Sequence, residues 1–244
     1  MEIMASLGWI LCLASVLILY GFSPYFLNAE EAQSLMARNQ GSILATWISG
    51  LYSIVLGGGY GHVQVSRGAN LFYRAAGSSD VSRMVAISLA CTTPLVICGG
   101  VTFLLLTLSN LIWGKGVWVS FVSVFQFSLL FYLPFLACCF LSVGVGARIS
   151  SGAGAIAGLT VFVAGSFLPP LLSIAAAVGP AWMETLWALL PHFYAMDWSP
   201  AVIYMWDPAE WVQFGSLFFY GTCWAVFLFV VGSVLFYSSP SQNE

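Results

Sequence analysis

Positively charged side chains gather in one stretch of this sequence, residues 57–83 (GGGYGHVQVSRGANLFYRAAGSSDVSR). The stretch holds Arg67, Arg74 and Arg83, half of the six Lys and Arg residues in the chain. A charged side chain at the centre of a membrane costs about 2.5–3.5 kcal/mol on insertion scales, so these arginines must lie outside the hydrocarbon. Long apolar runs flank the stretch, which predicts a polar loop between two membrane-spanning helices. Guanidinium groups in such a loop can bind acidic residues of a partner protein or anionic lipid.

Residues that could carry out catalysis or bind a metal are few and are predicted to lie apart. The sequence has no G-x-x-x-x-G-K-[ST] phosphate-binding motif, and its one lysine, Lys115, falls in a predicted outer turn. His62 and His192 are predicted on opposite membrane faces and so cannot share a metal or a haem. Cys138 and Cys139 are adjacent on one predicted helix and point in different directions, which makes them a poor chelate.

Ionisable residues are also missing from the predicted membrane interior. No predicted span has Asp, Glu, Lys or Arg well inside it. Ion-coupled transporters and enzymes that use general acid–base chemistry place such groups there. We therefore expect a protein that is not itself an enzyme, with no catalytic residue, no metal site and no cofactor.

The composition shows what kind of fold must position these residues. The chain has 244 residues, is 60% hydrophobic and 6% charged, and has a mean hydropathy of +0.95. Soluble domains carry about 25% charged residues, so the composition excludes a water-soluble fold. The net charge of −3, without any basic run, argues against a nucleic-acid partner. All six cysteines fall inside predicted spans, which predicts small buried thiols and no disulfide framework.

The hydropathy pattern predicts an all-α, polytopic membrane protein with six transmembrane helices in a single domain, 1–244. The predicted spans are 6–27, 43–61, 84–108, 118–146, 153–176 and 214–237. A short polar connector is predicted before Ile43. Gly57 and Gly61 have GxxxG spacing, which allows two helix backbones to approach closely. In the fifth span, Gly154, Gly158 and Gly165 lie on one predicted packing face, and Pro169-Pro170 predicts a break or bend.

A tryptophan-rich segment, 179–212, separates the fifth span from the last. It contains five tryptophans and four acidic residues but no Lys or Arg. Tryptophan favours the membrane–water interface, because its ring is apolar while its N–H needs a partner. We therefore expect short interfacial or re-entrant helices here. His192 is expected to be a cap or a surface residue.

The distribution of charge predicts that both termini are cytoplasmic, because positive residues are enriched in cytoplasmic loops. With this orientation the inner loops hold Arg67, Arg74, Arg83 and Arg148, and the outer loops hold Arg38 and Lys115. The acidic residues predicted outside are Glu30, Glu31, Glu184, Asp197, Asp207 and Glu210. The loop 62–83 is then the sizeable polar segment on the inner face.

This pattern resembles the six-helix permease subunits of exporter-type ABC transporters, whose ATPase is a separate chain. Three features carry the resemblance. The first is SRGANLFYRAAGSSDVSRMVAISLA, in which residues 77–83 (GSSDVSR) match a turn before the third span. The second is LLPHFYAMDWSPAVIY at 189–204, which is similar to a segment before the last helix of these permeases. The third is the layout of six spans with a long outer segment between the fifth and the sixth.

The resemblance implies that a cytoplasmic ABC ATPase docks on the inner loop and drives transport. Residues 66–76 would form a coupling helix, with Leu71 and Phe72 in a groove of the ATPase and Arg67 and Arg74 against its acidic rim. The implied coupling residues are Arg67, Leu71, Phe72, Arg74, Gly77, Asp80 and Arg83. The other interpretation is that the arginines only anchor the loop to anionic lipid, at about 1 kcal/mol each. The apolar Leu71-Phe72 pair between them favours docking.

The outer segment has two interpretations as well. Trp187, Pro191, His192, Asp197, Trp198 and Pro200 form an outer gate if the prolines break short helices at membrane depth. Otherwise the same residues form an interfacial belt. The expected protein is an exporter permease in a bacterial plasma (inner) membrane, surrounded by lipid and paired as a homodimer or with a second permease. The alternative function is a non-transporting scaffold or assembly subunit of a larger membrane complex.

Overall fold

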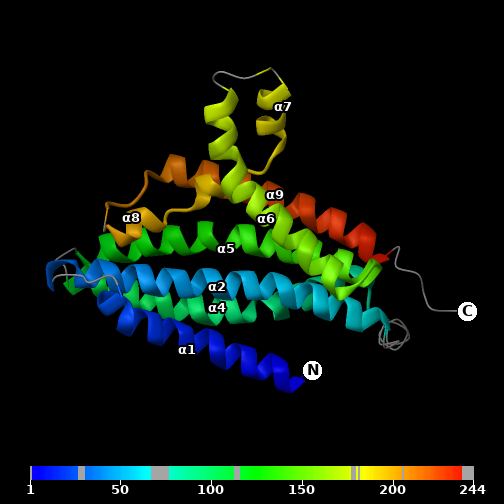
Figure 1. Cartoon of the computed structure of the whole chain (residues 1–244), viewed down its shortest axis with the longest axis horizontal. Helices are drawn as coiled ribbons and strands as arrows, with labels where there is room; N and C mark the ends of the chain where they lie inside the picture. Colours follow the sequence, from blue (N-terminus) through cyan, green and yellow to red (C-terminus); the bar gives the residue numbers. More distant parts are fainter. Residues whose placement is uncertain are drawn as a thin grey trace, which may run out of the picture. The chain divides into compact units, whose positions relative to one another are not determined.

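The computed structural model describes residues 2–26, 31–66, 77–112, 116–176, 180, 182–204 and 206–237 (Figure 1). Every regular element in these ranges is helical, which confirms the predicted all-α class. The elements are α1 (Glu2–Phe26), α2 (Glu31–Ser66), α4 (Asp80–Ile112), α5 (Val117–Arg148), α6 (Ser151–Ala176), α7 (Trp182–Leu189), the 3₁₀ helix η1 (Phe193–Met196), α8 (Ser199–Ile203) and α9 (Trp211–Tyr237).

Five of these helices are long and apolar enough to cross a membrane. The qualifying stretches are Ser34–Val65 in α2, Asp80–Ile112, Val117–Arg148, Ser151–Ile174 in α6 and Trp211–Tyr237. A span needs about 20 predominantly apolar residues. In α1 the described apolar stretch, Ile10–Pro24, is shorter than that. The chain is therefore an integral membrane protein with five candidate spans, and the sixth span stays a prediction.

The helices extend beyond the apolar runs from which the spans were predicted. The clearest difference is α2, which begins at Glu31, so most of the predicted polar connector before Ile43 is helical. Its first residues, EAQSLMAR, are mostly strong helix formers, and this favours helix even where hydropathy is low. At 36 residues α2 is about 54 Å long, which exceeds the ~30 Å hydrocarbon core.

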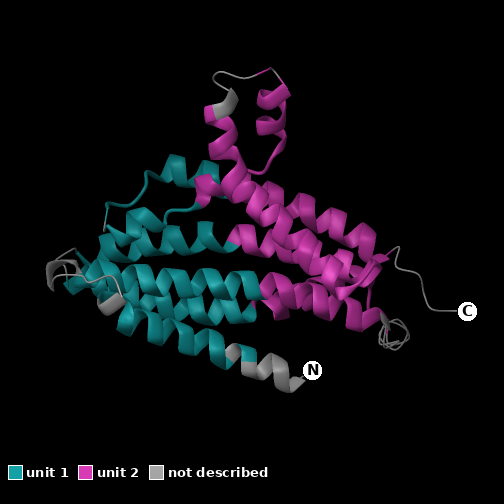
Figure 2. Cartoon of the chain, in the orientation of Figure 1, with its two compact units in different colours: residues 1–52, 93–132, 197–218 teal, residues 53–92, 133–196, 219–244 magenta. Residues whose placement is uncertain are grey.

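The chain divides into two compact units (Figure 2). Unit 1 comprises Met1–Tyr52, Thr93–Tyr132 and Asp197–Phe218; unit 2 comprises Ser53–Thr92, Leu133–Met196 and Phe219–Glu244. Four of the five boundaries fall within α2, α4, α5 and α9, so each of these helices contributes to both units, and the fifth lies between η1 and α8.

In unit 1, parts of α1, α2, α4 and α5 lie side by side (Figure 2). Gly41 of α2 brings the backbone of α1 close, because a Cβ at this position would overlap the carbonyl of Leu19. Between α2 and α4, the hydroxyls of Thr46 and Thr102 are hydrogen-bonded at 2.8 Å. The Thr102 hydroxyl also lies 3.3 Å from the carbonyl oxygen of Ser42. The Thr46–Thr102 hydrogen bond therefore places these two residues at the same height along the antiparallel helices α2 and α4.

In unit 2, glycines bring four helices into backbone contact. A Cβ at Gly58 of α2 would lie 2.6 Å from the backbone nitrogen of Ala155 in α6. Gly146 of α5 meets the carbonyl of Gly58, and Gly144 of α5 meets that of Gly232 in α9. Such contacts require residues without a side chain.

The packing predicted from glycine spacing is confirmed in unit 2. Gly57 contacts Cys139 of α5, and a Cβ at Gly61 would overlap the Val143 carbonyl. Gly154 and Gly158 of α6 likewise face the backbone of α5. Within α6 the helix continues through Pro169-Pro170 and changes direction along its length, so the predicted bend is present (Figure 1).

Ser142 of α5 joins the same interface with polar contacts. Its hydroxyl lies 2.7 Å from the Ile54 carbonyl oxygen in α2 and 2.9 Å from the Gly154 carbonyl oxygen in α6. A serine hydroxyl is small enough for this site and lets α5 hold both neighbouring backbones.

Candidate functional site

The turn before α4 and the first turn of this helix contain three of the implied coupling residues: Gly77, Asp80 and Arg83. Arg67, Leu71, Phe72 and Arg74 lie outside the described residues. Gly77 has φ +78°, a left-handed conformation that favours glycine. The backbone N–H of Ser82 donates to the Ser79 hydroxyl at 3.1 Å, which caps the helix start. Asp80 follows in the first turn, where its negative charge suits the helix dipole.

Arg83 lies buried at the start of α4, with 7% of its surface exposed. It forms an ion pair with Asp80, and its guanidinium carbon lies 5.8 Å from the centre of the Phe236 ring in α9. A cation over an aromatic face is attracted by the ring's negative charge distribution. Arg83 therefore joins α4 to α9, and its guanidinium group is not part of the exposed surface.

The first half of the predicted outer site is a compact hairpin in unit 2. Figure 1 shows α7 beside the end of α6, and the two helices are in contact. The backbone N–H of His192 donates to the Tyr220 hydroxyl at 2.8 Å, and its Nε2 lies 2.9 Å from the Trp187 carbonyl oxygen. The His192 and Trp187 rings are 4.4 Å apart between centres. Pro191 is buried against Gly165 of α6.

The contact of Nε2 with the Trp187 carbonyl oxygen, in the last turn of α7, is of the capping kind expected for His192. Its ring is half-buried and lies between the rings of Trp187 and Tyr220. The imidazole of a histidine fits here because its ring stacks on aromatic faces while its nitrogen reaches a backbone carbonyl. The sequence alone did not indicate this, since Tyr220 is distant along the chain.

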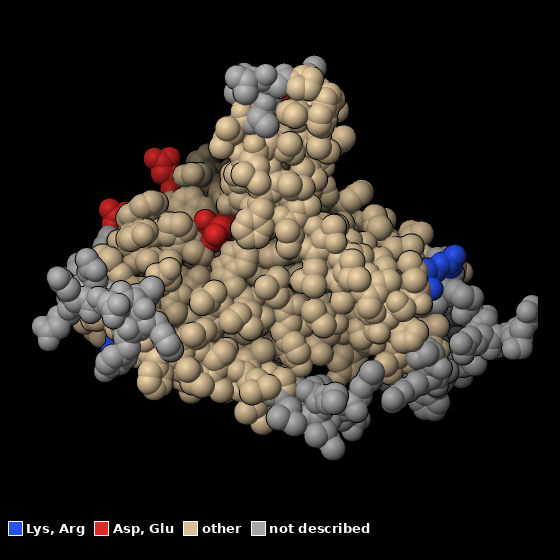
Figure 3. Space-filling view, in the orientation of Figure 1, with Lys and Arg blue, Asp and Glu red and all other residues tan. Residues whose placement is uncertain are grey.

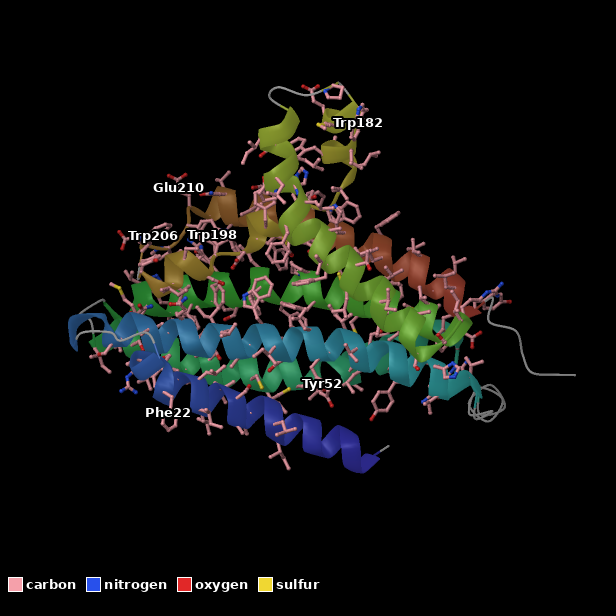
Figure 4. All side chains as sticks on the ribbon, viewed as in Figure 1. Phe22, Tyr52, Trp182, Trp198, Trp206 and Glu210 are labelled. Atoms are coloured by element: carbon pink, nitrogen blue, oxygen red, sulfur yellow. The ribbon has the colours of Figure 1, made fainter. Side chains whose placement is uncertain are left out.

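The second half of the predicted outer site belongs to unit 1 and forms a local turn. Asp197 Oδ1 accepts the Ser199 backbone N–H at 3.0 Å, Trp198 stands at the N-terminus of α8, and Pro200 lies exposed in its first turn. The predicted short helices of the segment are thus present as α7, η1 and α8. Figure 4 labels Trp198 and Trp206 in this part of the chain.

A glutamine of α5 holds the chain that follows α8. The side-chain amide of Gln126 donates to the Ala209 carbonyl oxygen at 3.1 Å and accepts the Ala209 N–H at 2.9 Å. Gln126 is 1% exposed, so both of its polar atoms need such partners. Asp207 and Glu210, on either side of Ala209, are exposed. Most of the described surface in Figure 3 is uncharged, as expected for a membrane protein.

A cavity of about 300 Å³ lies between α2, α4 and α5 in unit 1. Thr46 lines it from α2, Gly99 and Gly100 from α4, and Phe127 and Phe131 from α5. Gly100 is exposed, and a Cβ there would have no atom within 4 Å, so the cavity is open on this side. Pockets of this size with apolar walls and few polar groups are typical small-molecule sites. The sequence did not predict this cavity, because its lining residues come from three helices and meet only in the fold.

Among the described residues, no three His, Cys, Asp or Glu side chains gather as a metal site requires. All six cysteines are free thiols; five are buried as predicted, and Cys223 is exposed.

Comparison with protein-family models, with curated proteins and with solved structures finds no match for this chain. Its function therefore has to be argued from its own residues.

Proposed function

We propose that this chain is the membrane-spanning permease subunit of an ATP-driven exporter of the ABC class, coupled to a separate cytoplasmic ATPase. The observation that carries the proposal is how firmly the start of α4 is held. Gly77 and Ser79 form a capped turn, and Arg83 pairs with Asp80 within the first turn of α4 and lies over the Phe236 ring of α9. A helix start held in this way stays folded when a force acts on the preceding turn, so the force is passed on to the whole of α4.

We propose that the segment 62–83 receives this force. The helix α2 continues to Ser66, so a force on residues 67–76 acts on two long helices. We propose that Leu71 and Phe72 enter an apolar groove of the ATPase, while Arg67 and Arg74 bind its acidic rim. Closure of the ATPase pair then moves the helices between two packings as rigid bodies.

The proposed topology has six spans, with α1 as the first and both termini cytoplasmic. Two permease chains, alike or different, form the pathway in a bacterial plasma membrane. The acidic, tryptophan-bearing outer segment then lies on the external side, where its lack of Lys and Arg agrees with the distribution of charge in membrane proteins.

The first experiment tests the orientation of the coupling turn. The variant Ser78→Cys/Cys223→Ser is treated with a membrane-impermeant thiol reagent. We expect labelling in opened membranes and none in intact cells. Labelling from outside intact cells would refute the topology and the docking site together.

The second experiment tests coupling. The tagged chain is purified from its own host in mild detergent, and co-purifying vanadate-sensitive ATP hydrolysis is measured. We expect the Phe72→Ala/Arg74→Glu variant to lose most of this activity, because the apolar contact and one charge are gone. Arg148→Glu, which changes an exposed arginine at the end of α5, is the matched control and should retain it. Equal ATP hydrolysis in all three chains, or none in the unaltered chain, would favour a non-transporting scaffold.

A further inference from the structure

Four buried polar residues in unit 1 form a group that we name the polar cluster: Asn39 of α2, Ser109 and Asn110 of α4, and Ser120 of α5. Each is at most 3% exposed. Five of their atoms have no hydrogen-bond partner among the described residues: both side-chain polar atoms of Asn39, Asn110 Oδ1 and the two serine hydroxyls. Buried polar atoms are nearly always paired, so such a group indicates a ligand or ordered water.

The first two members lie at the same level of α2 and α4. The Thr46–Thr102 hydrogen bond joins these helices, which run antiparallel. Asn39 lies seven residues before Thr46, and Ser109 lies seven residues after Thr102. Seven residues are nearly two full turns, so both side chains return to the α2–α4 interface, about 10 Å beyond the threonine pair.

The other two members lie along α4 and α5. On α5, Ser120 directly precedes Phe121, whose ring centre lies 5.6 Å from that of Phe103 in the cavity wall. On α4, Asn110 lies seven residues, or about two turns, beyond Phe103. The polar cluster therefore extends from the edge of the cavity to about 10 Å beyond it.

The atoms of the polar cluster define the chemistry of a ligand. They are uncharged and include a donor, Asn39 Nδ2, as well as acceptors. A metal cation would leave that donor unpaired, whereas hydroxyl groups both donate and accept. The neighbouring cation, Arg38, lies over the Tyr20 ring at 5.7 Å, so its charge has its own partner on α1. The polar cluster thus suits an uncharged, hydroxyl-bearing group.

We propose that α2, α4 and α5 bind a single-chain amphiphile, with its uncharged hydroxylated headgroup in the polar cluster and its hydrocarbon chain in the cavity. The walls of the cavity suit a hydrocarbon chain, since Phe127 and Phe131 are apolar and Gly100 adds no polar side chain. The assignment of this ligand as the exporter's cargo rests on the proposed function, but the binding site does not.

Binding is measured on the purified chain alone, so ATPase coupling does not enter the result. The probe is a monoacylglycerol brominated in mid-chain, which quenches nearby tryptophan. Trp47 is the reporter, because its ring lies 5.5 Å from that of Phe131 in the cavity wall. The difference in fluorescence between the unaltered chain and Trp47→Phe isolates its signal. We expect saturable quenching of Trp47.

Two variants separate the halves of the site. Gly100→Leu places a side chain at the open side of the cavity and should raise the half-saturating concentration at least tenfold, while Gly215→Leu, also at a glycine with open space around it, should leave it unchanged. Asn39→Leu should raise it at least tenfold as well. If that variant does not fold, Ser109→Ala/Ser120→Ala removes two hydroxyls with little change in packing, and we expect a rise of at least threefold.

The outcomes that overturn the proposal are specific. Non-saturable quenching, equal in Gly100→Leu and in the unaltered chain, would mean contact with surrounding amphiphile only. Unchanged affinity in Asn39→Leu, or in the double serine variant, would mean that the polar cluster holds only water. Equal binding of a brominated alkane, or stronger binding of a brominated anionic lysolipid, would exclude an uncharged headgroup site. None of these results affects the ATPase experiment, so the binding site and the proposed function can be refuted separately.

Discussion

The close packing of α2 against α6 can be tested with two adjacent glycines. Gly58 and Gly59 both lie inside α2, but a Cβ at Gly58 would come within 2.6 Å of the Ser151 carbonyl oxygen, and one at Gly59 would meet nothing within 4 Å. Alanine has the same helix propensity at both positions, so the difference between Gly58→Ala and Gly59→Ala isolates the contact. The obstructing atoms are backbone and cannot rotate away. Overpacking of this kind costs about 1–3 kcal/mol.

This difference should be visible as a shift in unfolding. About 1–3 kcal/mol corresponds to roughly 5- to 150-fold in the unfolding equilibrium, with Gly58→Ala the less stable. Both variants carry Cys223→Ser, which leaves the five buried cysteines as reporters. A thiol-reactive dye then follows their exposure during denaturation in mixed micelles. Equal midpoints for the two variants would refute the close approach of α2 and α6, and with it the packing argument for unit 2.

Three further changes test single contacts. Gln126→Leu removes both hydrogen bonds to the Ala209 backbone, so amide exchange at Ala209 should rise by one to two orders of magnitude, reflecting about 1–3 kcal/mol; unchanged exchange would contradict the contact. Arg83→Leu removes the cation that pairs with Asp80 and should lower the free energy of unfolding by about 3–5 kcal/mol. Adding Asp80→Asn to the same chain should recover part of the loss, and no recovery would contradict the pairing. Cys223 alone should react with a small thiol reagent in the folded, unaltered chain, as judged by mass spectrometry of its peptides.

Much of the fold could be predicted because membrane-spanning helices can be recognised from their apolar composition. Each of the five candidate spans overlaps a predicted apolar run. The spacing of Gly57 and Gly61 also predicted a packing face, since close helix contact in lipid requires small residues. The start of α2 could not be predicted in this way. Hydropathy locates the part of a helix that suits hydrocarbon, whereas Glu31 and the residues after it extend the helix through backbone propensity.

The candidate sites were harder to predict because they depend on residues that meet only in the fold. Gln126 and Ala209 are far apart in sequence, and nothing in either local sequence indicates the pairing. The role of Arg83 was also hidden, since its ring partner is the distant Phe236. For Asn39, a polar residue at the edge of an apolar run indicated a loop, not a buried position. These contacts can be recognised only once it is known which residues of neighbouring helices lie at the same level.

The two units differ in how they satisfy the requirements of a membrane interior. Lipid supplies no hydrophobic force between helices, so stability there comes from close packing and internal hydrogen bonds. Unit 2 follows this rule: Gly58, Gly144 and Gly146 bring backbones into contact, and Ser142 reaches two carbonyls. Unit 1 departs from it, with a 300 Å³ cavity and the polar cluster. Unit 2 is closely packed, whereas unit 1 keeps unpaired polar atoms buried beside a cavity. The simplest explanation is that unit 1 retains the cavity and the polar cluster for a ligand, since departures from consistent packing concentrate at functional sites.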